Sequence, residues 1–204
     1  YGYQWFVNGG LIAAINQTLT GSNFNRDDEV VCLVTPNDGT DDGFPVSSSP
    51  LVINNTAPEI SSASLGPDPA QVTDQLSCIA GTSSDVDNDN IVLSYQWNVN
   101  GQSISATGSI LTAPNFVSGD VVRCEITPGD GTTVGLSATS NELTISNSAP
   151  SISSVSLTPT SPYENTLLTC TPSGWTDADG DAESYLYSWT VNGNGLGVST
   201  STLD

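Results

Sequence analysis

The feature that most constrains the fold of this chain is an internal repeat with a period of 92 residues. An aromatic segment occurs three times, as Tyr3-Gln4-Trp5, Tyr95-Gln96-Trp97 and Tyr187-Ser188-Trp189. A Val-Asn-Gly triplet follows each copy at the same offset, and no insertion or deletion disturbs the register between copies. A period this regular predicts a tandem array, in which each copy is one structural unit.

A second recurring segment predicts where one copy ends and the next begins. Asn55-Thr56-Ala57-Pro58 returns one period later as Asn147-Ser148-Ala149-Pro150. We therefore expect three parts: the C-terminal part of a repeat at residues 1–57, a complete repeat at 58–149, and the N-terminal part of a repeat at 150–204. The two incomplete parts are expected either to belong to a longer array or to be completed by neighbouring chains.

Composition and hydrophobic pattern together predict an all-β fold. Good helix formers are scarce, whereas Ser, Thr, Asn, Asp, Gly and Val are abundant. Apolar and polar residues alternate over about seven short segments of the complete repeat, which is typical of a β-sandwich. Asn100-Gly101 predicts a tight hairpin, because both central positions of a type I′ turn need positive φ. The apolar positions that mark the strands are Ile60, Ala63, Leu65, Leu76, Cys78, Leu93, Tyr95, Trp97, Val99, Ile110, Leu111, Val122, Cys124, Ile126, Leu143 and Ile145.

The cysteines and the tryptophan of the complete repeat have an informative order. Cys78 and Cys124 are 46 residues apart, and Trp97 lies 19 residues after the first. This spacing resembles the immunoglobulin-like fold, and the chain resembles the tandem immunoglobulin-like, cadherin-like or PKD-like repeats of bacterial surface proteins. The resemblance implies tandem immunoglobulin-like β-sandwiches with a Cys78–Cys124 disulfide across the two sheets. It also implies that Trp5, Trp97 and Trp189 belong to buried cores.

Two further cysteines, Cys32 and Cys170, are the other copies of this pair. Their partners are expected outside their own fragments or in a neighbouring chain. A second pairing stays open, because all four cysteines are spaced by 46 residues and a Cys32–Cys78 bond would shift the repeat boundaries. Paired cysteines indicate an oxidising compartment, so we expect an extracellular or cell-surface location.

The charge of the chain argues against several classes of function. Twenty-two acidic residues stand against two arginines, and the net charge of −20 would repel nucleic acid and anionic membranes. The sequence contains no apolar run of about 18 residues, so we predict no insertion of this segment into a membrane. Lys, His and Met are absent, and no carboxylate pair stands in a recognisable glycosidase pattern. We therefore predict that the chain is not an enzyme.

Two acidic runs with alternating carboxylates predict calcium sites. Asp85-Val86-Asp87-Asn88-Asp89 recurs one period later as Asp177-Ala178-Asp179-Gly180-Asp181. Carboxylates that converge in a loop repel one another unless a hard divalent cation neutralises them. In an immunoglobulin-like sandwich the first run lies near Asp130 and the entry linker, where a cation would stiffen the junction between repeats. The alternative is a solvated acidic loop. The candidate ligands are Asp85, Asp87, Asp89, Asp130, Asp177, Asp179 and Asp181. For Asp38, Asp41 and Asp42, in the equivalent loop of the first fragment, a turn role is favoured over a ligand role.

These features predict a structural segment of a long extracellular fibre, stalk or adhesin, pinned by disulfides and braced by Ca²⁺. The strict spacing favours this function, because binding and catalytic modules usually carry long irregular loops. We expect self-association or continuation into a longer repeat array. The alternative is a carbohydrate- or receptor-binding surface module, with Trp175 as a possible ligand contact. Asn16 and Asn54 match the N-glycosylation triplet, and their modification stays open.

Overall fold

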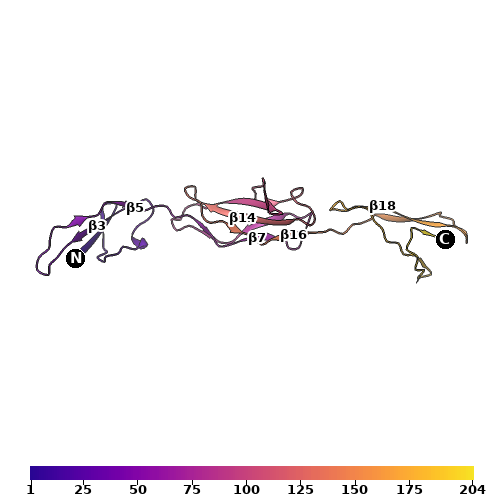
Figure 1. Ribbon diagram of the computed structural model, residues 1–204, viewed down its shortest axis with the longest axis horizontal. Coiled ribbons are helices and arrows are strands. Elements are labelled where there is room, and N and C mark those ends of the chain that lie inside the picture. The colour runs from indigo at the N-terminus through magenta and orange to yellow at the C-terminus, as the bar shows by residue number, and fades with distance from the viewer. The chain divides into compact units, whose positions relative to one another are not determined.

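The computed structural model describes residues 1–204, and its regular structure is almost entirely β-strand (Figure 1). Its one helical element is a short 3-10 turn, η1 (Gly21–Asn23). The all-β class predicted from the sequence is confirmed. No helix is long and apolar enough to cross a lipid bilayer.

Contacts within the chain divide it into two compact units. The first comprises Tyr1–Ser64, Cys78–Gln96 and Cys124–Ser140, and the second comprises Leu65–Ser77, Trp97–Arg123 and Asn141–Asp204. Residues 58–149, the complete repeat of the sequence, contribute strands to both units. The division into three parts at residues 57 and 149 stays a prediction.

Residues 1–57 of the first unit form one antiparallel sheet. Its strands are β1 (Gly2–Val7), β2 (Gly10–Ile12), β3 (Glu29–Thr35), β4 (Val46–Ser47) and β5 (Leu51–Val52). The strand order is β2-β1-β3-β4, and β5 also pairs with β3. Trp5 on β1 lies opposite Ile12 on β2 and Cys32 on β3, so the indole and the thiol belong to neighbouring strands.

The β1–β2 hairpin closes through a two-residue turn with an unusual backbone conformation. Asn8 and Gly9 have φ angles of 48° and 78°. Asn100 and Gly101, one period later, have φ angles of 51° and 77° and join β11 (Val92–Val99) to β12 (Gln102–Ile104). Positive φ at both positions is the signature of the type I′ turn. The hairpin predicted at Asn100-Gly101 is therefore confirmed.

The complete repeat contains a larger and a smaller sheet. Its remaining strands are β6 (Glu59–Ile60), β7 (Ala63–Gly66), β8 (Ala70–Gln71), β9 (Leu76–Ala80), β10 (Ser83–Ser84), β13 (Ile110–Leu111), β14 (Val121–Gly129), β15 (Ala138–Thr139) and β16 (Leu143–Ser146). The larger sheet has the order β12-β11-β14-β16-β8, with β15 paired to β14 and the β16–β8 pair parallel. The smaller sheet has the order β13-β9-β7, and β6 pairs with β10.

A disulfide between Cys78 on β9 and Cys124 on β14 joins the smaller sheet to the larger one. The predicted pairing is confirmed, and Cys32–Cys78 is not the pair that forms. Closing a loop of 46 residues stabilises the fold by about 4 kcal/mol on the chain-entropy model. Buried side chains come from both sheets, as in a β-sandwich. They include Leu65, Leu76 and Leu111 from the smaller sheet and Trp97, Val122, Ile126, Leu143 and Ile145 from the larger one.

Each predicted core tryptophan makes the same hydrogen bond in its own copy of the repeat. The indole N–H groups of Trp5, Trp97 and Trp189 donate to backbone carbonyls eleven residues further on, at 3.0, 2.7 and 2.9 Å. Trp97 is fully buried and Trp189 is 8% exposed, whereas Trp5 is half-buried. The repeat in the sequence is thus also a repeat of local contacts.

Residues 150–204 of the second unit form a three-stranded sheet and a short hairpin. Their strands are β17 (Ser154–Thr158), β18 (Leu168–Ser173), β19 (Thr190–Val191), β20 (Asn194–Gly195) and β21 (Thr202–Leu203). The sheet has the order β17-β18-β21, and β19 pairs with β20. Shifted by one period, this sheet matches β7-β9-β13, the smaller sheet of the complete repeat. The N-terminal sheet matches strands of the larger one in the same way.

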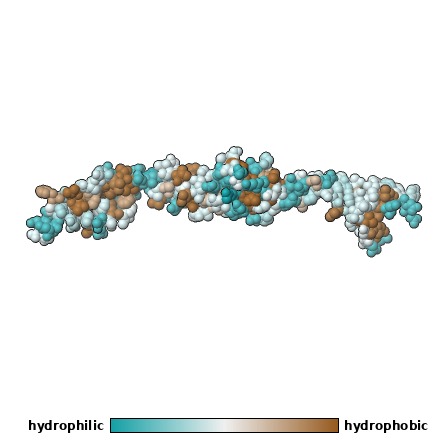
Figure 2. Space-filling model, in the orientation of Figure 1, coloured by the Kyte–Doolittle hydropathy of each residue, from teal (hydrophilic) through white to brown (hydrophobic).

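Each terminal sheet exposes apolar residues whose counterparts in the complete repeat are buried. Leu51 is 64% exposed, but Leu143, one period later, is 2% exposed. Leu157 is 53% exposed, but Leu65, one period earlier, is 5% exposed. Apolar surface is visible over both terminal parts in Figure 2. Each terminal sheet therefore has the face of a sandwich layer without the opposing layer.

Candidate cation sites at the acidic loops

The first acidic loop, Asp85–Asp89, folds around the Asp85 carboxylate in the first unit. The backbone N–H groups of Asp87 and Asp89 donate to Asp85 Oδ1 at 2.8 and 3.3 Å. Asn88 has a φ of 64°, a conformation that asparagine tolerates better than most residues. Carboxylate oxygens of Asp85 and Asp89 from this turn, and of Asp130 from another loop, lie within 4.8 Å of one another. Asp85 Oδ2 is buried and has no hydrogen-bond donor.

Asp130 lies in the loop after β14 and is held as an anion by hydrogen bonds. The backbone N–H groups of Thr132 and Thr133 both donate to Asp130 Oδ1 at 2.6 Å. The side-chain amide of Asn55 donates to Asp130 Oδ2 at 2.7 Å. The bond from the Thr133 backbone, followed by that from Asn55, holds the pKa of Asp130 well below its usual range. Asp130 therefore adds a negative charge to this cluster at neutral pH.

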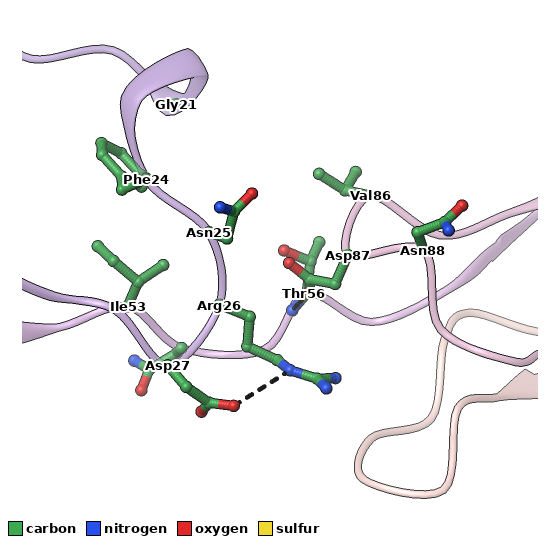
Figure 3. A pocket seen from close by; sticks show the side chains of 11 residues that line it. Gly21, Phe24, Asn25, Arg26, Asp27, Ile53, Thr56, Val86, Asp87 and Asn88 are labelled. Atoms are coloured by element: carbon green, nitrogen blue, oxygen red, sulfur yellow. Dashed lines mark hydrogen bonds and ion pairs between the residues drawn. The ribbon is translucent and has the colours of Figure 1, made fainter. Parts of the chain in front are cut away.

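Asp87 contacts the linker that precedes the repeat and lies outside the cluster of Asp85, Asp89 and Asp130. The backbone N–H of Thr56 donates to Asp87 Oδ2 at 2.6 Å, and Figure 3 shows these two residues together at one side of a pocket of about 460 Å³. Asn55, the preceding linker residue, also donates to Thr133 Oγ1 at 2.8 Å. The linker is thus bonded to both loops, as the sequence predicts for the entry side of the sandwich.

Arg26 carries a positive charge into the first cluster. Its guanidinium forms an ion pair with Asp89 and donates to Asn55 Oδ1 at 2.6 Å. Its Nε lies 3.4 Å from Asp27 Oδ2, the contact drawn in Figure 3. Burial lowers the pKa of Arg26, but the charges of Asp89 and Asp27 outweigh that effect and raise it. One of the three carboxylates in the cluster is therefore already paired.

The second acidic loop, Asp177–Asp181, has the same internal bonds in the second unit. The N–H groups of Asp179 and Asp181 donate to Asp177 Oδ1 at 2.8 and 3.3 Å. The backbone N–H of the linker residue Ser148 donates to Asp179 Oδ2 at 2.5 Å. Oxygens of all three aspartates lie within 4.8 Å of one another. Asp177 Oδ2 and Asp179 Oδ1 are buried and have no donor.

The donor sets of both loops fit a hard divalent cation. Calcium takes roughly six to eight oxygen ligands, and short carboxylates, backbone carbonyls and water supply them in flexible loops. Buried carboxylate oxygens almost always accept hydrogen bonds, so an oxygen without a donor needs another electrostatic partner. Asp85 Oδ2, Asp177 Oδ2 and Asp179 Oδ1 are such oxygens. A cation bound at these loops would satisfy them and reduce the repulsion among the carboxylates.

The remaining predicted site residues lie outside the acidic clusters. Cys32 on β3 and Cys170 on β18 are half-buried free thiols. Trp175 is half-buried, and its ring meets that of Tyr185 edge-on at 5.6 Å, so part of its surface is used inside the chain. A hydrogen bond to Glu183 raises the pKa of Tyr185 to about 12. Asp38 Oδ1 accepts the backbone N–H groups of Thr40 and Asp41, which is the turn role predicted for it.

Sequence reasoning did not find the roles of Arg26, Asn55 and Ser148. Arg26 is 63 residues from Asp89, and no spacing rule connects them. The rarity of positive charge was the available signal, because an acidic chain with two cations places each one where it meets carboxylates. The recurring Asn-Thr/Ser-Ala-Pro segment marked the linker but gave no sign that its backbone bonds to the acidic loop.

Comparison with known proteins finds no family model that matches the chain and no curated protein with significant sequence similarity.

Proposed function

We propose that this chain is a structural segment of an extracellular fibre, stalk or adhesin, in which sandwich repeats are linked in series. The proposal rests on a difference in exposure between equivalent positions of the repeat. Leu51 and Leu157 are exposed, whereas their counterparts one period away, Leu143 and Leu65, are buried. Burying a leucine side chain contributes roughly 1.5 to 3 kcal/mol. The open sheets are therefore strongly favoured to find the complementary layer, supplied by another copy of the repeat.

The free cysteines support the same arrangement. Cys32 corresponds to Cys124 of the larger sheet, and Cys170 corresponds to Cys78 of the smaller sheet. When a sheet like that of residues 150–204 covers a sheet like that of residues 1–57, the two thiols take the places of the disulfide. Such a bond belongs in an oxidising environment outside the cell. The partner of this chain is thus a further repeat, in a longer array or in a second copy.

Calcium is the proposed brace of the junctions in this array. The linker N–H groups of Thr56 and Ser148 donate to Asp87 and Asp179 of the repeat that follows. A cation bound beside these carboxylates would hold the acidic loop, and through it the linker, in one conformation. An affinity of about 0.1 to 1 mM, as in other extracellular modules, suits this role.

Two variants, each with one of the two free cysteines replaced, test whether copies of the repeat complete one another. Chains with Cys32→Ser keep Cys170, and chains with Cys170→Ser keep Cys32. When the two are mixed under air, we expect a disulfide-linked dimer, detected on non-reducing gels and mapped by mass spectrometry as Cys170–Cys32. Each variant alone is the matched control for random oxidation. Equal amounts of mixed and same-variant dimers would contradict the proposal, because they would show that the sheets have no preference for each other.

A further inference from the structure

The two acidic loops share their local structure bond for bond. Four hydrogen bonds of the first loop and its linker recur in the second, one period later. In the first loop, the backbone N–H groups of Asp87 and Asp89 donate to Asp85 Oδ1, that of Thr56 donates to Asp87 Oδ2, and the Asn55 side chain donates to the Thr56 carbonyl. In the second loop, the corresponding donors are Asp179, Asp181, Ser148 and Asn147, and each donates to the equivalent acceptor. A difference in cation binding between the loops must therefore come from the groups around them.

Each cluster has three carboxylates, with Asp130 in the first cluster where the second has Asp179. The difference in positive charge is the guanidinium of Arg26. It pairs with Asp89 and with the linker residue Asn55 at the first loop. The residue one period after Arg26 is Ser118, which has no charge. The other cation of the chain, Arg123, lies 3.9 Å from Glu142 and contacts neither loop. The first loop thus has its own positive charge, and the second loop has none.

The two loops also differ in the number of buried carboxylate oxygens that lack a hydrogen-bond donor. At the second loop two such oxygens, Asp177 Oδ2 and Asp179 Oδ1, belong to two of the three carboxylates of the cluster, and no cationic side chain pairs with that cluster. At the first loop one such oxygen, Asp85 Oδ2, remains where Arg26 pairs with the neighbouring Asp89. Guanidinium and calcium both neutralise carboxylates. A carboxylate cluster that is already paired with a guanidinium therefore binds calcium more weakly.

We infer that Arg26 is a built-in counter-ion that replaces calcium at the first acidic loop, so that the chain binds one calcium ion, at Asp177, Asp179 and Asp181. This inference rests on the calcium brace proposed above and assigns it to one of the two junctions. The first junction is held by a side chain at any calcium concentration. The second depends on the calcium concentration of its surroundings.

Calcium titration followed by backbone amide NMR tests this assignment residue by residue. In the chain as it is, we expect the amides of Asp179 and Asp181 to shift with calcium and those of Asp87 and Asp89 to stay unchanged. Arg26→Ser copies the second junction into the first, so it should add calcium-dependent shifts at Asp87 and Asp89. Arg123→Ser removes the same charge elsewhere and should leave the pattern of the parent chain. Magnesium at equal ionic strength controls for screening.

The reverse exchange keeps the test decisive if Arg26→Ser does not fold. Ser118→Arg copies the first junction into the second, and it should abolish the shifts at Asp179 and Asp181. Shifts at both loops of the parent chain with the same midpoint would overturn the role of Arg26 while leaving the calcium brace intact. No shift at either loop in any variant would overturn both proposals.

Discussion

Asp28 holds the turn before β3 through contacts that recur one period later. Its Oδ2 accepts the backbone N–H of Asn25 at 2.7 Å, and its Oδ1 accepts the side-chain amide of Asn8 at 2.6 Å. Asp120 accepts the same two bonds from Val117 and Asn100 in the complete repeat. The hydrogen bond from the Asn25 backbone, followed by that from Asn8, lowers the pKa of Asp28 from its ordinary value of 3.8. Both bonds favour the ionised carboxylate.

Asp28→Asn should therefore destabilise the fold at neutral pH and have little effect in acid. The folded-state pKa is lowered, so the stability that Asp28 contributes is present above pH 3.8 and is lost as pH falls through the folded-state value. We expect the melting temperatures of the variant and the parent chain to converge as pH decreases below about 4. Thermal unfolding followed by tryptophan fluorescence between about pH 2 and 7 measures this.

Glu29→Gln is the matched control, because it removes the same charge at the neighbouring exposed position. A constant difference between Asp28→Asn and the parent chain at every pH would contradict the ionic role of Asp28.

At the scale of the elements, the β11–β12 hairpin depends on the left-handed conformation of its turn. Gly101 has a φ of 77°, and a Cβ built there meets nothing within 4 Å. A side chain at this position is therefore opposed by backbone strain alone. Gly101→Ala should lower the free energy of unfolding by about 1 kcal/mol.

Urea unfolding measures this loss, and Gly108→Ala is its control in the same repeat. Gly108 lacks a positive φ, and a Cβ placed on it has no neighbour closer than 3.9 Å. Equal stability losses in the two variants would contradict the argument from backbone conformation.

The elements were largely predictable from the sequence, but the contacts of the acidic loops were only partly so. Alternation of apolar residues and the Asn100-Gly101 pair are local signals. They led to the turn and to most strands of the complete repeat, but β8, β10 and β15 contain none of the apolar positions that marked the predicted strands. The Cys78–Cys124 pairing followed from the family resemblance. The sequence predicted that Asp85, Asp87 and Asp89 lie together near Asp130. Asp85 and Asp89 do converge with Asp130, whereas Asp87 bonds to the linker instead. The sequence did not indicate Arg26, because contacts of a long side chain across a linker depend on how loops meet and leave no periodic trace.

At the scale of the whole molecule, the net charge of −20 opposes the proposed association of copies through the open sheets. Like-charged chains repel over distances comparable to the Debye length, which is about 30 Å at 0.01 M salt and about 8 Å at 0.15 M. Added salt should therefore increase the rate at which the Cys32→Ser and Cys170→Ser variants form their mixed dimer. A time course on non-reducing gels between about 10 and 300 mM NaCl measures this.

Alkylation of Cys32 by iodoacetamide, a neutral reagent, is the control for thiol reactivity and should not change with salt. A rate of mixed-dimer formation that stays constant or decreases with salt would show that charge repulsion does not limit association.

The two open sheets of this chain are unlike, since one matches the larger layer of the sandwich and the other matches the smaller layer. A layer of one type therefore accepts only the other type, and successive links in the proposed array must all point the same way. The resulting polymer has a head and a tail, and it grows without branching. A copy stripped of either sheet would act as a terminator, so the ratio of such caps to intact chains would set the length of the filament.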